Sequence, residues 1–250
     1  MVGRQLRRGP RRAHHAPDRT LDPPRPAPSL ARRARAPSMK LLILGATGTI
    51  GRELVHGALE RGHPVTAQTR QGQPGFPAGV TPAVFDPAST PDIFCPHLRG
   101  HDAVIYALGF RGRAPVRFFS ETTRSLLAAM QAMGVRRLVA ITGVGAGETR
   151  GHGGFLYEHL IYPFFTQAIY ADKDRQEELI RASDTDWTIL RPAPFRSAPG
   201  REPFHVLTDV RTGTRLSRVT PPEVARVSLD CAEKGLHRGE AVFFGHGVAG

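Results

Sequence analysis

Short apolar runs alternate with segments of helical periodicity from about residue 39 to residue 245. The first run, residues 41–44, is continuous and stops at Gly45, which predicts a strand buried on both faces. Similar runs predict further strands at residues 64–70, 80–85, 101–109, 136–142, 186–191 and 241–244. Helical periodicity predicts helices at residues 52–60, 92–98, 118–133, 155–182 with a break at Pro163, and 221–234.

This alternation of strands and helices predicts the α/β fold class, with a Rossmann-type doubly wound parallel sheet and helices on both faces. Ligands of such sheets bind outside the carboxyl ends of the strands. We therefore expect the functional residues to follow the predicted strands, at Gly45, Arg70, Asp86, Leu108, Gly109, Thr142 and Gly143.

Three glycines follow the first strand at three-residue spacing, and the first helix is predicted directly after them. A strand, a glycine turn and a helix in this order indicate a dinucleotide-binding site. Gly45 would allow the tight turn, Gly48 the close approach of a pyrophosphate, and Gly51 the packing of the helix on the strand. The spacing G-x-x-G-x-x-G is a variant of the dinucleotide fingerprint, and the alternative is a turn that only joins a strand to a helix.

The end of the second predicted strand bears on the choice between NAD and NADP. An NAD site of this type places an Asp or Glu near this point, where the carboxylate accepts a hydrogen bond from the ribose 2′-hydroxyl. This chain has Arg70, whose guanidinium can bind a 2′-phosphate through two parallel hydrogen bonds. We therefore expect NADP (NADPH) as the cofactor rather than NAD; the alternative for Arg70 is a solvated side chain at a strand end.

Asp86 follows the third predicted strand and has two interpretations of equal weight. Its carboxylate could accept a hydrogen bond from the adenine amino group of the cofactor. It could equally begin the turn at Asp86-Pro87, because Asp is favoured where a turn starts.

The positive charge of the chain is concentrated in residues 1–38. This segment holds ten arginines, two aspartates and seven prolines, which leaves a charge of only +4 for residues 39–250 out of the total of +12. Because it has few residues that could pack, we expect a disordered Arg/Pro-rich leader. Three interpretations of this segment are open: a nucleic-acid-binding arm, an Arg-rich organelle leader, or an extension upstream of Met39 as the start of the functional protein. We favour the extension because Met39 begins the first predicted strand directly.

Residues 39–250 are expected to form one domain that acts on a small-molecule substrate. Their modest charge does not indicate nucleic acid as a partner, and no apolar stretch approaches the ~20 residues that span a membrane. Cys95 and Cys231 have neither metal-ligand spacing nor a disulfide framework, which favours a cytoplasmic protein without a metal. The sequence does not distinguish a monomer from a dimer.

Lys173 lies on the helix predicted after the glycine-rich loop of residues 143–154. If it faces the strand ends, its ammonium could bond the nicotinamide ribose hydroxyls and stabilise the charge that is transferred. The alternative is a solvated lysine among Asp172, Asp174 and Glu177.

Three stretches resemble the short-chain dehydrogenase/reductase superfamily in its atypical branch, which includes biliverdin reductase B (flavin reductase)-type proteins and NmrA-like redox sensors. They are residues 42–51, residues 102–109, and the stretch from Lys173 through Glu177 to Pro192. The resemblance covers roughly residues 39–245. It implies an NAD(P)-binding Rossmann domain with a small C-terminal substrate-binding part, built mainly from about residues 144–165 and 193–220.

The resemblance also implies a role for each part of the predicted cofactor site. The backbone of the glycine turn would hold the pyrophosphate, the arginine the 2′-phosphate, and the aspartate would lie by the adenine. The end of the fourth strand would lie near the nicotinamide-side ribose. The residues assigned in this way are Gly45, Thr47, Gly48, Thr49, Ile50, Gly51, Arg70, Asp86, Leu108, Gly109, Thr142 and Lys173.

The sequence departs from the family at the acid. Typical members have a Tyr four residues before the Lys, where this chain has Ile169, and Tyr170 is about 100° away around the helix. Typical members also place a Ser after the fifth strand, where this chain has Thr142. The catalytic candidates are therefore Lys173 and Thr142.

This departure favours one class of reaction. Reduction of a carbonyl would need the missing Tyr to protonate the alkoxide, whereas a flavin or quinone can take its proton from water. We therefore expect an NADPH-dependent oxidoreductase that reduces a flat conjugated acceptor. Candidates for an aromatic acceptor pocket are Phe110, Tyr157, Tyr162, Phe164 and Phe165.

Two alternatives remain open. One is a non-catalytic NADP redox sensor of the NmrA-like type, which the incomplete catalytic set supports. The other is an NAD-dependent epimerase-type enzyme, which is disfavoured because the chain after Pro192 is short for a sugar-nucleotide domain.

Overall fold

The structure is a computed structural model that describes residues 37–72, 75–109, 117–143, 167–210 and 213–249. Within these ranges nine strands form one sheet: β1 (Leu41–Leu44), β2 (Val65–Thr69), β3 (Val80–Val84), β4 (Ala103–Tyr106), β5 (Arg137–Ile141), β6 (Asp186–Pro192), β7 (Phe204–Leu207), β8 (Thr214–Arg218) and β9 (Glu240–Ala249). Their order in the sheet is β3-β2-β1-β4-β5-β6-β9-β7, and β8 also pairs with β9. The first six strands and the start of β9 are parallel, whereas β7 and β8 run antiparallel to β9.

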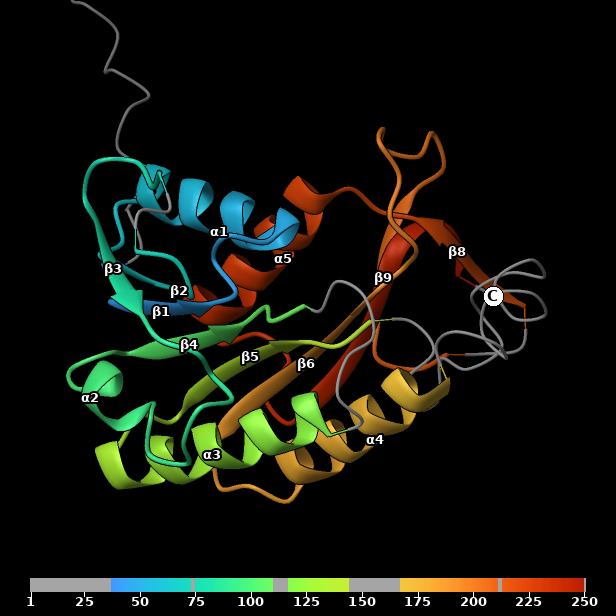
Figure 1. Cartoon of the computed structure of the whole chain (residues 1–250). Coiled ribbons are helices and arrows are strands. Elements are labelled where there is room, and N and C mark those ends of the chain that lie inside the picture. Colours follow the sequence, from blue (N-terminus) through green and yellow to red (C-terminus); the bar gives the residue numbers. More distant parts are fainter. Residues whose placement is uncertain (1–36, 73–74, 110–116, 144–166, 211–212, 250) are drawn as a thin grey trace, which may run out of the picture. The chain divides into compact units, whose positions relative to one another are not determined.

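Helices cover both faces of this sheet (Figure 1). On one face, α1 (Thr49–Glu60) packs against α5 (Pro221–Lys234). On the other face lie α2 (Cys95–Leu98), α3 (Phe118–Met133) and α4 (Gln167–Arg181), with α3 packed against both α2 and α4. The predicted doubly wound, mostly parallel α/β fold is therefore confirmed.

The central strands are buried on both faces because alternate side chains point to opposite helix layers. Leu41 and Ile43 of β1 join the apolar cluster under α1 and α5, while Leu42 and Leu44 join the cluster under α2 and α3. All four side chains are fully buried, and each contributes roughly 1.5–3 kcal/mol. The glycine turn that follows β1 thus starts from a rigid strand.

Polar contacts hold α5 against α1 and the sheet. His63 accepts a hydrogen bond from the Met39 backbone N–H and pairs with Glu233 of α5 at 2.7 Å. The buried Arg137 of β5 also contacts α5, where it donates to the backbone carbonyl of Cys231 at 2.6 Å. These bonds fix a helix whose first residue, Pro221, borders the functional cleft.

The predicted element bounds agree closely in two helices and differ elsewhere. The helices predicted at residues 118–133 and 221–234 are α3 and α5 with the same bounds. The first helix begins earlier than predicted, at Thr49, and β9 continues beyond the predicted end to Ala249. Residues 1–36 of the predicted leader, residues 144–165 of the predicted substrate part and the predicted helix break at Pro163 lie outside the described residues.

Candidate functional site

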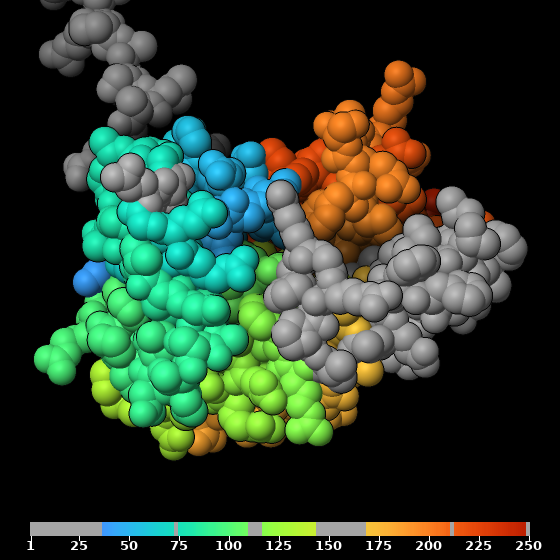
Figure 2. Space-filling model, viewed as in Figure 1, coloured from blue at the N-terminus to red at the C-terminus, as the bar shows by residue number. Residues whose placement is uncertain are grey.

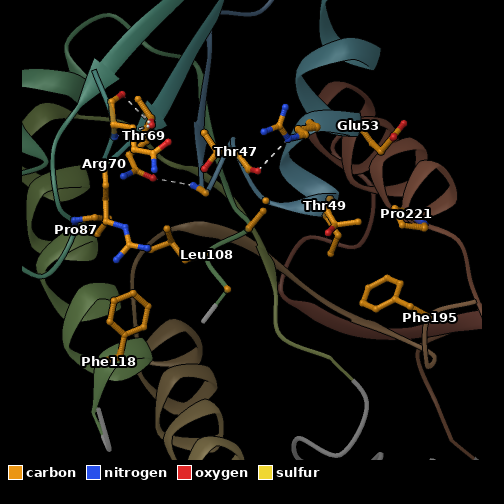
Figure 3. Close-up of a pocket in the computed structure, with 18 of the residues that line it drawn as sticks. Thr47, Thr49, Glu53, Thr69, Arg70, Pro87, Leu108, Phe118, Phe195 and Pro221 are labelled. Atoms are coloured by element: carbon orange, nitrogen blue, oxygen red, sulfur yellow. Dashed lines mark hydrogen bonds between the residues drawn. The ribbon is translucent and has the colours of Figure 1, made fainter. Parts of the chain in front are cut away.

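A cleft of about 1300 Å³ opens at the carboxyl ends of the parallel strands. Its volume exceeds the roughly 300–1,000 Å³ typical of a small-ligand pocket. Figure 3 shows the glycine turn with Thr47 between the two sides of this cleft. The labelled residues around it are Arg70, Pro87, Leu108 and Phe118 on one side and Thr49, Phe195 and Pro221 on the other.

The glycine turn is shaped by two close backbone contacts. Gly45 has a positive φ of 76°, and a Cβ there would lie 2.5 Å from the carbonyl oxygen of Ala107 at the end of β4. A Cβ on Gly51 would lie 2.1 Å from the carbonyl oxygen of Gly45. The turn therefore requires glycine at both positions, which agrees with the roles predicted for Gly45 and Gly51. The close approach of a pyrophosphate to Gly48 stays a prediction.

Gln68 holds this turn to the neighbouring strands. It is buried near the end of β2, where its Oε1 accepts a hydrogen bond from the Gly45 backbone N–H at 2.9 Å. Its Nε2 donates to the Phe85 carbonyl at 2.8 Å. Gln68 thus ties the glycine turn to β2 and to the end of β3, a structural role that its position in the sequence did not indicate.

The N-terminus of α1 has the features of an anion site. Its N-cap residue, Gly48, is extended and provides no side-chain cap, and the first turn of the helix contains no acidic residue. The first backbone N–H groups of a helix need an external acceptor, and the helix dipole favours an anion there. The N-terminus of α5, which also borders the cleft, differs because Thr220 and Glu223 form a capping box. Of these two helices, α1 is the one whose N-terminus lacks a side-chain cap.

Arg70 and Asp86 both line the cleft, as predicted. Arg70 is exposed and has no carboxylate partner among the described residues, so its guanidinium is available to a ligand. Asp86 Oδ1 accepts a hydrogen bond from the Ala88 backbone N–H at 3.1 Å. This bond shows the turn that was one of the two interpretations of Asp86; a contact with adenine stays a prediction.

The opposite side of the cleft comes from the segment after β6. Phe195, Arg196 and Ser197 line it, and the Phe195 side chain is 47% exposed. In Figure 2 the residues near 200 (orange) rise beside α1 (blue) on the face that is shown. The three residues fall within the predicted substrate-binding part, residues 193–220, but none of them was predicted individually, although the strand-end rule applied to β6 would have found them.

Thr142 and Lys173, the predicted catalytic residues, lie together at the end of β5, next to β4. The Lys173 ammonium donates a hydrogen bond to the Thr142 backbone carbonyl and lies 5.0 Å from the centre of the Phe119 ring. The Thr142 hydroxyl donates to Glu177 Oε1 at 2.7 Å. Burial lowers the pKa of Lys173 to about 8, and the Glu177 carboxylate opposes this change. Lys173 is therefore a partly buried, hydrogen-bonded group rather than the solvated lysine of the alternative interpretation.

Ile169, which stands where typical members of the family have a Tyr, also has apolar neighbours in the fold. Ile169 packs against the apolar cluster that lies between the sheet and the helices α2, α3 and α4. Tyr170 is half-buried on the same helix. The five aromatic residues suggested for an acceptor pocket lie outside the described residues, and Phe195 is the exposed aromatic side chain in the described part of the cleft.

Nine of the predicted cofactor residues line the cleft together. Gly51, Thr142 and Lys173 do not line it, because Gly51 packs in the turn and the other two meet at the end of β5. The nine are Gly45, Thr47, Gly48, Thr49, Ile50, Arg70, Asp86, Leu108 and Gly109. What each of them binds stays a prediction.

The described residues contain neither a metal-binding cluster nor a membrane-spanning helix. No group of His, Cys, Asp or Glu residues in these ranges could hold a metal ion. No helix in the same ranges is long and apolar enough to cross a membrane.

The profile of the NAD(P)H-binding family matches residues 45–234, which include the glycine turn, Lys173 and α5. A curated relative is YhfK of Bacillus subtilis (strain 168), named as an uncharacterized sugar epimerase. It is 24% identical over 200 residues, which are 77% of this chain and 88% of YhfK.

Solved structures share the fold. SP1627 of Streptococcus pneumoniae TIGR4, a proposed NADH-flavin reductase, has a TM-score of 0.67 and 22% identity over 84% of this chain and 100% of that chain. A short-chain dehydrogenase/reductase of Veillonella parvula DSM 2008 in complex with NADP has a TM-score of 0.68 and 16% identity over 84% of this chain and 96% of that chain. At these identities the likeness establishes the fold and leaves the substrate open.

Proposed function

The chain belongs to the NAD(P)H-binding family, and from this premise we propose that it is an NADPH-dependent oxidoreductase that reduces a flat conjugated acceptor such as a flavin or a quinone. The observation that carries the proposal is the cleft itself. It combines an uncapped helix N-terminus, an arginine without a carboxylate partner among the described residues, and an exposed aromatic ring.

The residues of the cleft fit a dinucleotide. The uncapped N-terminus of α1, entered through the turn that Gly45 and Gly51 make possible, would hold the pyrophosphate by its backbone N–H groups. Asp86 would lie by the adenine, and Leu108 with Gly109 near the nicotinamide-side ribose. When bound in this way, the cofactor supplies a hydride.

Arg70 supports NADPH over NADH. It follows directly after β2, and the Gln68 side chain near the end of that strand is already bonded to Gly45 and Phe85. A site for NAD would need a carboxylate at this point, whereas a guanidinium attracts a 2′-phosphate. The NADP-bound neighbour from Veillonella parvula is consistent with this preference.

The acceptor class follows from the absence of an acid at Ile169. The Ile169 side chain cannot protonate an alkoxide, so a carbonyl substrate would lack the proton donor that typical members of the family carry at that position. A flavin or quinone takes its proton from water, and the chain then has only to place acceptor and cofactor against each other. Phe195 offers one flat apolar surface for this purpose. Lys173 would hold the ribose hydroxyls with the N–H groups that do not bond Thr142.

Two other functions have a specific observation in their favour. The missing acid also suits a non-catalytic NADP redox sensor of the NmrA-like type, in which binding alone changes the protein. The relation to YhfK supports an NAD-dependent epimerase-type enzyme. We rank the oxidoreductase first because Phe195 gives the cleft an exposed, flat apolar surface that suits a conjugated acceptor.

NADPH consumption tests the proposal. The purified chain should oxidise NADPH in the presence of at least one member of a panel of riboflavin, FMN, menadione and a benzoquinone, assayed anaerobically at 340 nm. NADPH binding without turnover for every acceptor would support the sensor. Conversion of a nucleotide sugar with NAD bound and no net NADPH oxidation would support the epimerase.

A pair of variants tests the roles on α4. Lys173→Ala should weaken NADPH binding or turnover by about ten- to a hundredfold, the range for hydrogen bonds from a charged donor. Tyr170→Phe should have a small effect on both, because Tyr170 is about 100° around the helix from the position of the family's acid. The measurements are NADPH titrations and steady-state rates with the same acceptor, on variants with unchanged circular dichroism.

The opposite outcome of this comparison is informative. A large loss in Tyr170→Phe with little change in Lys173→Ala would identify Tyr170 as the proton donor. Carbonyl reduction would then replace reduction of a conjugated acceptor as the proposed chemistry.

A further inference from the structure

A buried ion pair lies between α4 and the ends of β5 and β6. Glu177 and Arg191 are each only 3% exposed. Arg191 donates to both carboxylate oxygens of Glu177, with Nε 3.1 Å from Oε1 and an Nη atom bonded to Oε2. Arg181 adds a longer contact of 3.9 Å to Oε2. Two-point pairing of this kind fixes the plane and position of the carboxylate.

The same carboxylate reaches the end of β5 through Thr142. Its Oε1 accepts the hydrogen bond from the Thr142 hydroxyl at 2.7 Å, and Thr142 is 2% exposed. The backbone carbonyl of Thr142 is the acceptor of the Lys173 ammonium. Thr142 is therefore held by Glu177 through its side chain and holds Lys173 through its main chain.

The position of Thr142 brings this chain of contacts to the proposed site. β4 and β5 pair in parallel register up to Tyr106 opposite Ala140, and two residues further along these two segments are Leu108, which lines the cleft, and Thr142. Gly143 follows with a positive φ of 117°, and a Cβ there would lie 3.8 Å from Lys173 Nζ. The Lys173 ammonium thus lies at the carboxyl end of β5, on the side of the sheet where the nicotinamide-side ribose is proposed to bind.

Structural support alone is a weak explanation for the Glu177–Arg191 pair. Removing a carboxylate and a guanidinium from water costs several kcal/mol for each ion, and well-packed apolar residues of similar volume often stabilise a fold as well or better. An apolar pair could join α4 to β6, but it could neither hold the Thr142 hydroxyl nor place a negative charge beside Lys173.

We propose that Glu177 is a positioning residue for Lys173: clamped by Arg191, it fixes Thr142, whose carbonyl directs the Lys173 ammonium toward the cofactor ribose. The inference rests on the proposed function for the identity of the ligand. It assigns to Glu177 and Arg191 a role in the reaction that does not require either of them to touch the cofactor.

The charged groups around Lys173 determine the sign of the expected pH effect. From α4, Glu177 faces it, and Asp172 directs its carboxylate to the backbone N–H of Phe119 and to Ser120. From β6, Arg191 is neutralised by Glu177; from β5 the partner is a carbonyl, and from α3 an aromatic ring. Removing the Glu177 charge therefore removes an attraction and exposes Lys173 to Arg191.

The direct test is the titration of Lys173 in Glu177→Gln. The whole chain contains three lysines, Lys40, Lys173 and Lys234, so the Cε signals of protein with ¹³C-labelled lysine are few, and Lys173→Arg assigns them. In Glu177→Gln the pKa of Lys173 should fall by about one unit or more from its starting value of about 8, as expected when an opposite charge at close range is lost. The alkaline limb of NADPH affinity should move to lower pH by the same amount.

Glu178→Gln is the matched control. Glu178 is the next residue of α4, is exposed, and carries the same charge. Its removal should leave the Lys173 titration and the pH profile unchanged. Equal shifts in the two variants would indicate a general effect of net charge and overturn the proposal.

Thr142→Val covers the case in which Glu177→Gln does not fold. It removes the hydroxyl that bonds Glu177 and keeps the shape, the carbonyl and all charges. NADPH should then bind several-fold more weakly, with a smaller displacement of the Lys173 titration. An unaltered dissociation constant and titration in Thr142→Val would overturn the proposal.

The outcomes separate this inference from the proposed function. If Glu177→Gln leaves the Lys173 titration in place, the positioning role is wrong even when the enzyme turns over NADPH. If no acceptor supports turnover, the oxidoreductase proposal fails, while the titration in the NADPH-bound protein still decides the role of Glu177.

Discussion

Replacing Arg70 by alanine should weaken NADPH binding by about ten- to a hundredfold and leave NADH binding nearly unchanged. The expected loss corresponds to the roughly 1.5–3 kcal/mol of hydrogen bonds between a guanidinium and a phosphate. Arg70 borders the cleft directly after β2 and is exposed, with no carboxylate partner among the described residues. Because NADH has no 2′-phosphate, the same substitution removes nothing from it.

Isothermal titration of both cofactors against both proteins gives the measurement. Arg99→Ala is a suitable control, because Arg99 is an exposed arginine that precedes β4. It therefore lies toward the amino ends of the parallel strands, whereas the cleft lies at their carboxyl ends. Equal affinities for NADPH and NADH in the unaltered protein would contradict the proposed preference. Parallel losses of both cofactors in Arg70→Ala would mean that Arg70 shapes the cleft rather than recognises the phosphate.

The fold was predictable because its central strands are apolar without interruption. Residues 41–44 can be buried only between two layers, and the glycines after them predict the turn to α1. The full length of β9 was not predictable in the same way. Gly245 and Gly247 look like strand breakers, yet a Cβ on Gly247 would lie 1.9 Å from the carbonyl oxygen of Arg215. They permit the close approach of β8, a long-range contact that no local pattern reveals.

The nucleotide side of the site was also predictable from the strands, because the carboxyl ends of the strands in a parallel sheet all lie at the same end of the sheet. The environment of Lys173 was not. Asp172 and Glu177 are charged neighbours in a polar stretch, a pattern typical of a solvated face, but they are 1% and 3% exposed. Their burial depends on the start of α3 for Asp172 and on Arg191 for Glu177. These partners are distant in sequence, so helical periodicity could not identify them.

Gly51→Ala should strongly damage the cofactor turn. The added Cβ would lie 2.1 Å from the Gly45 carbonyl oxygen and 2.7 Å from Ala46 Cα, both of which are backbone atoms that cannot rotate away. The start of α1 must therefore move off β1. We expect a loss of about 3 kcal/mol, at the upper end for overpacking, and a fall in melting temperature of roughly 6–12 °C. NADPH affinity should fall with it, because the displaced N–H groups are those proposed to hold the pyrophosphate.

Gly57→Ala provides the matched control, because it is the same substitution six residues later in the same helix. There the new Cβ would meet only Leu229 Cδ1 at 3.0 Å, the tip of a flexible side chain. Alanine also favours the helix over glycine by about 1 kcal/mol, so the stability of this variant should change little or rise. Thermal unfolding and NADPH titration of both variants compare the two sites. If Gly51→Ala unfolds at the temperature of the unaltered protein, α1 can tilt away from β1 at little cost, and the third glycine is not what fixes the phosphate-binding end of the helix.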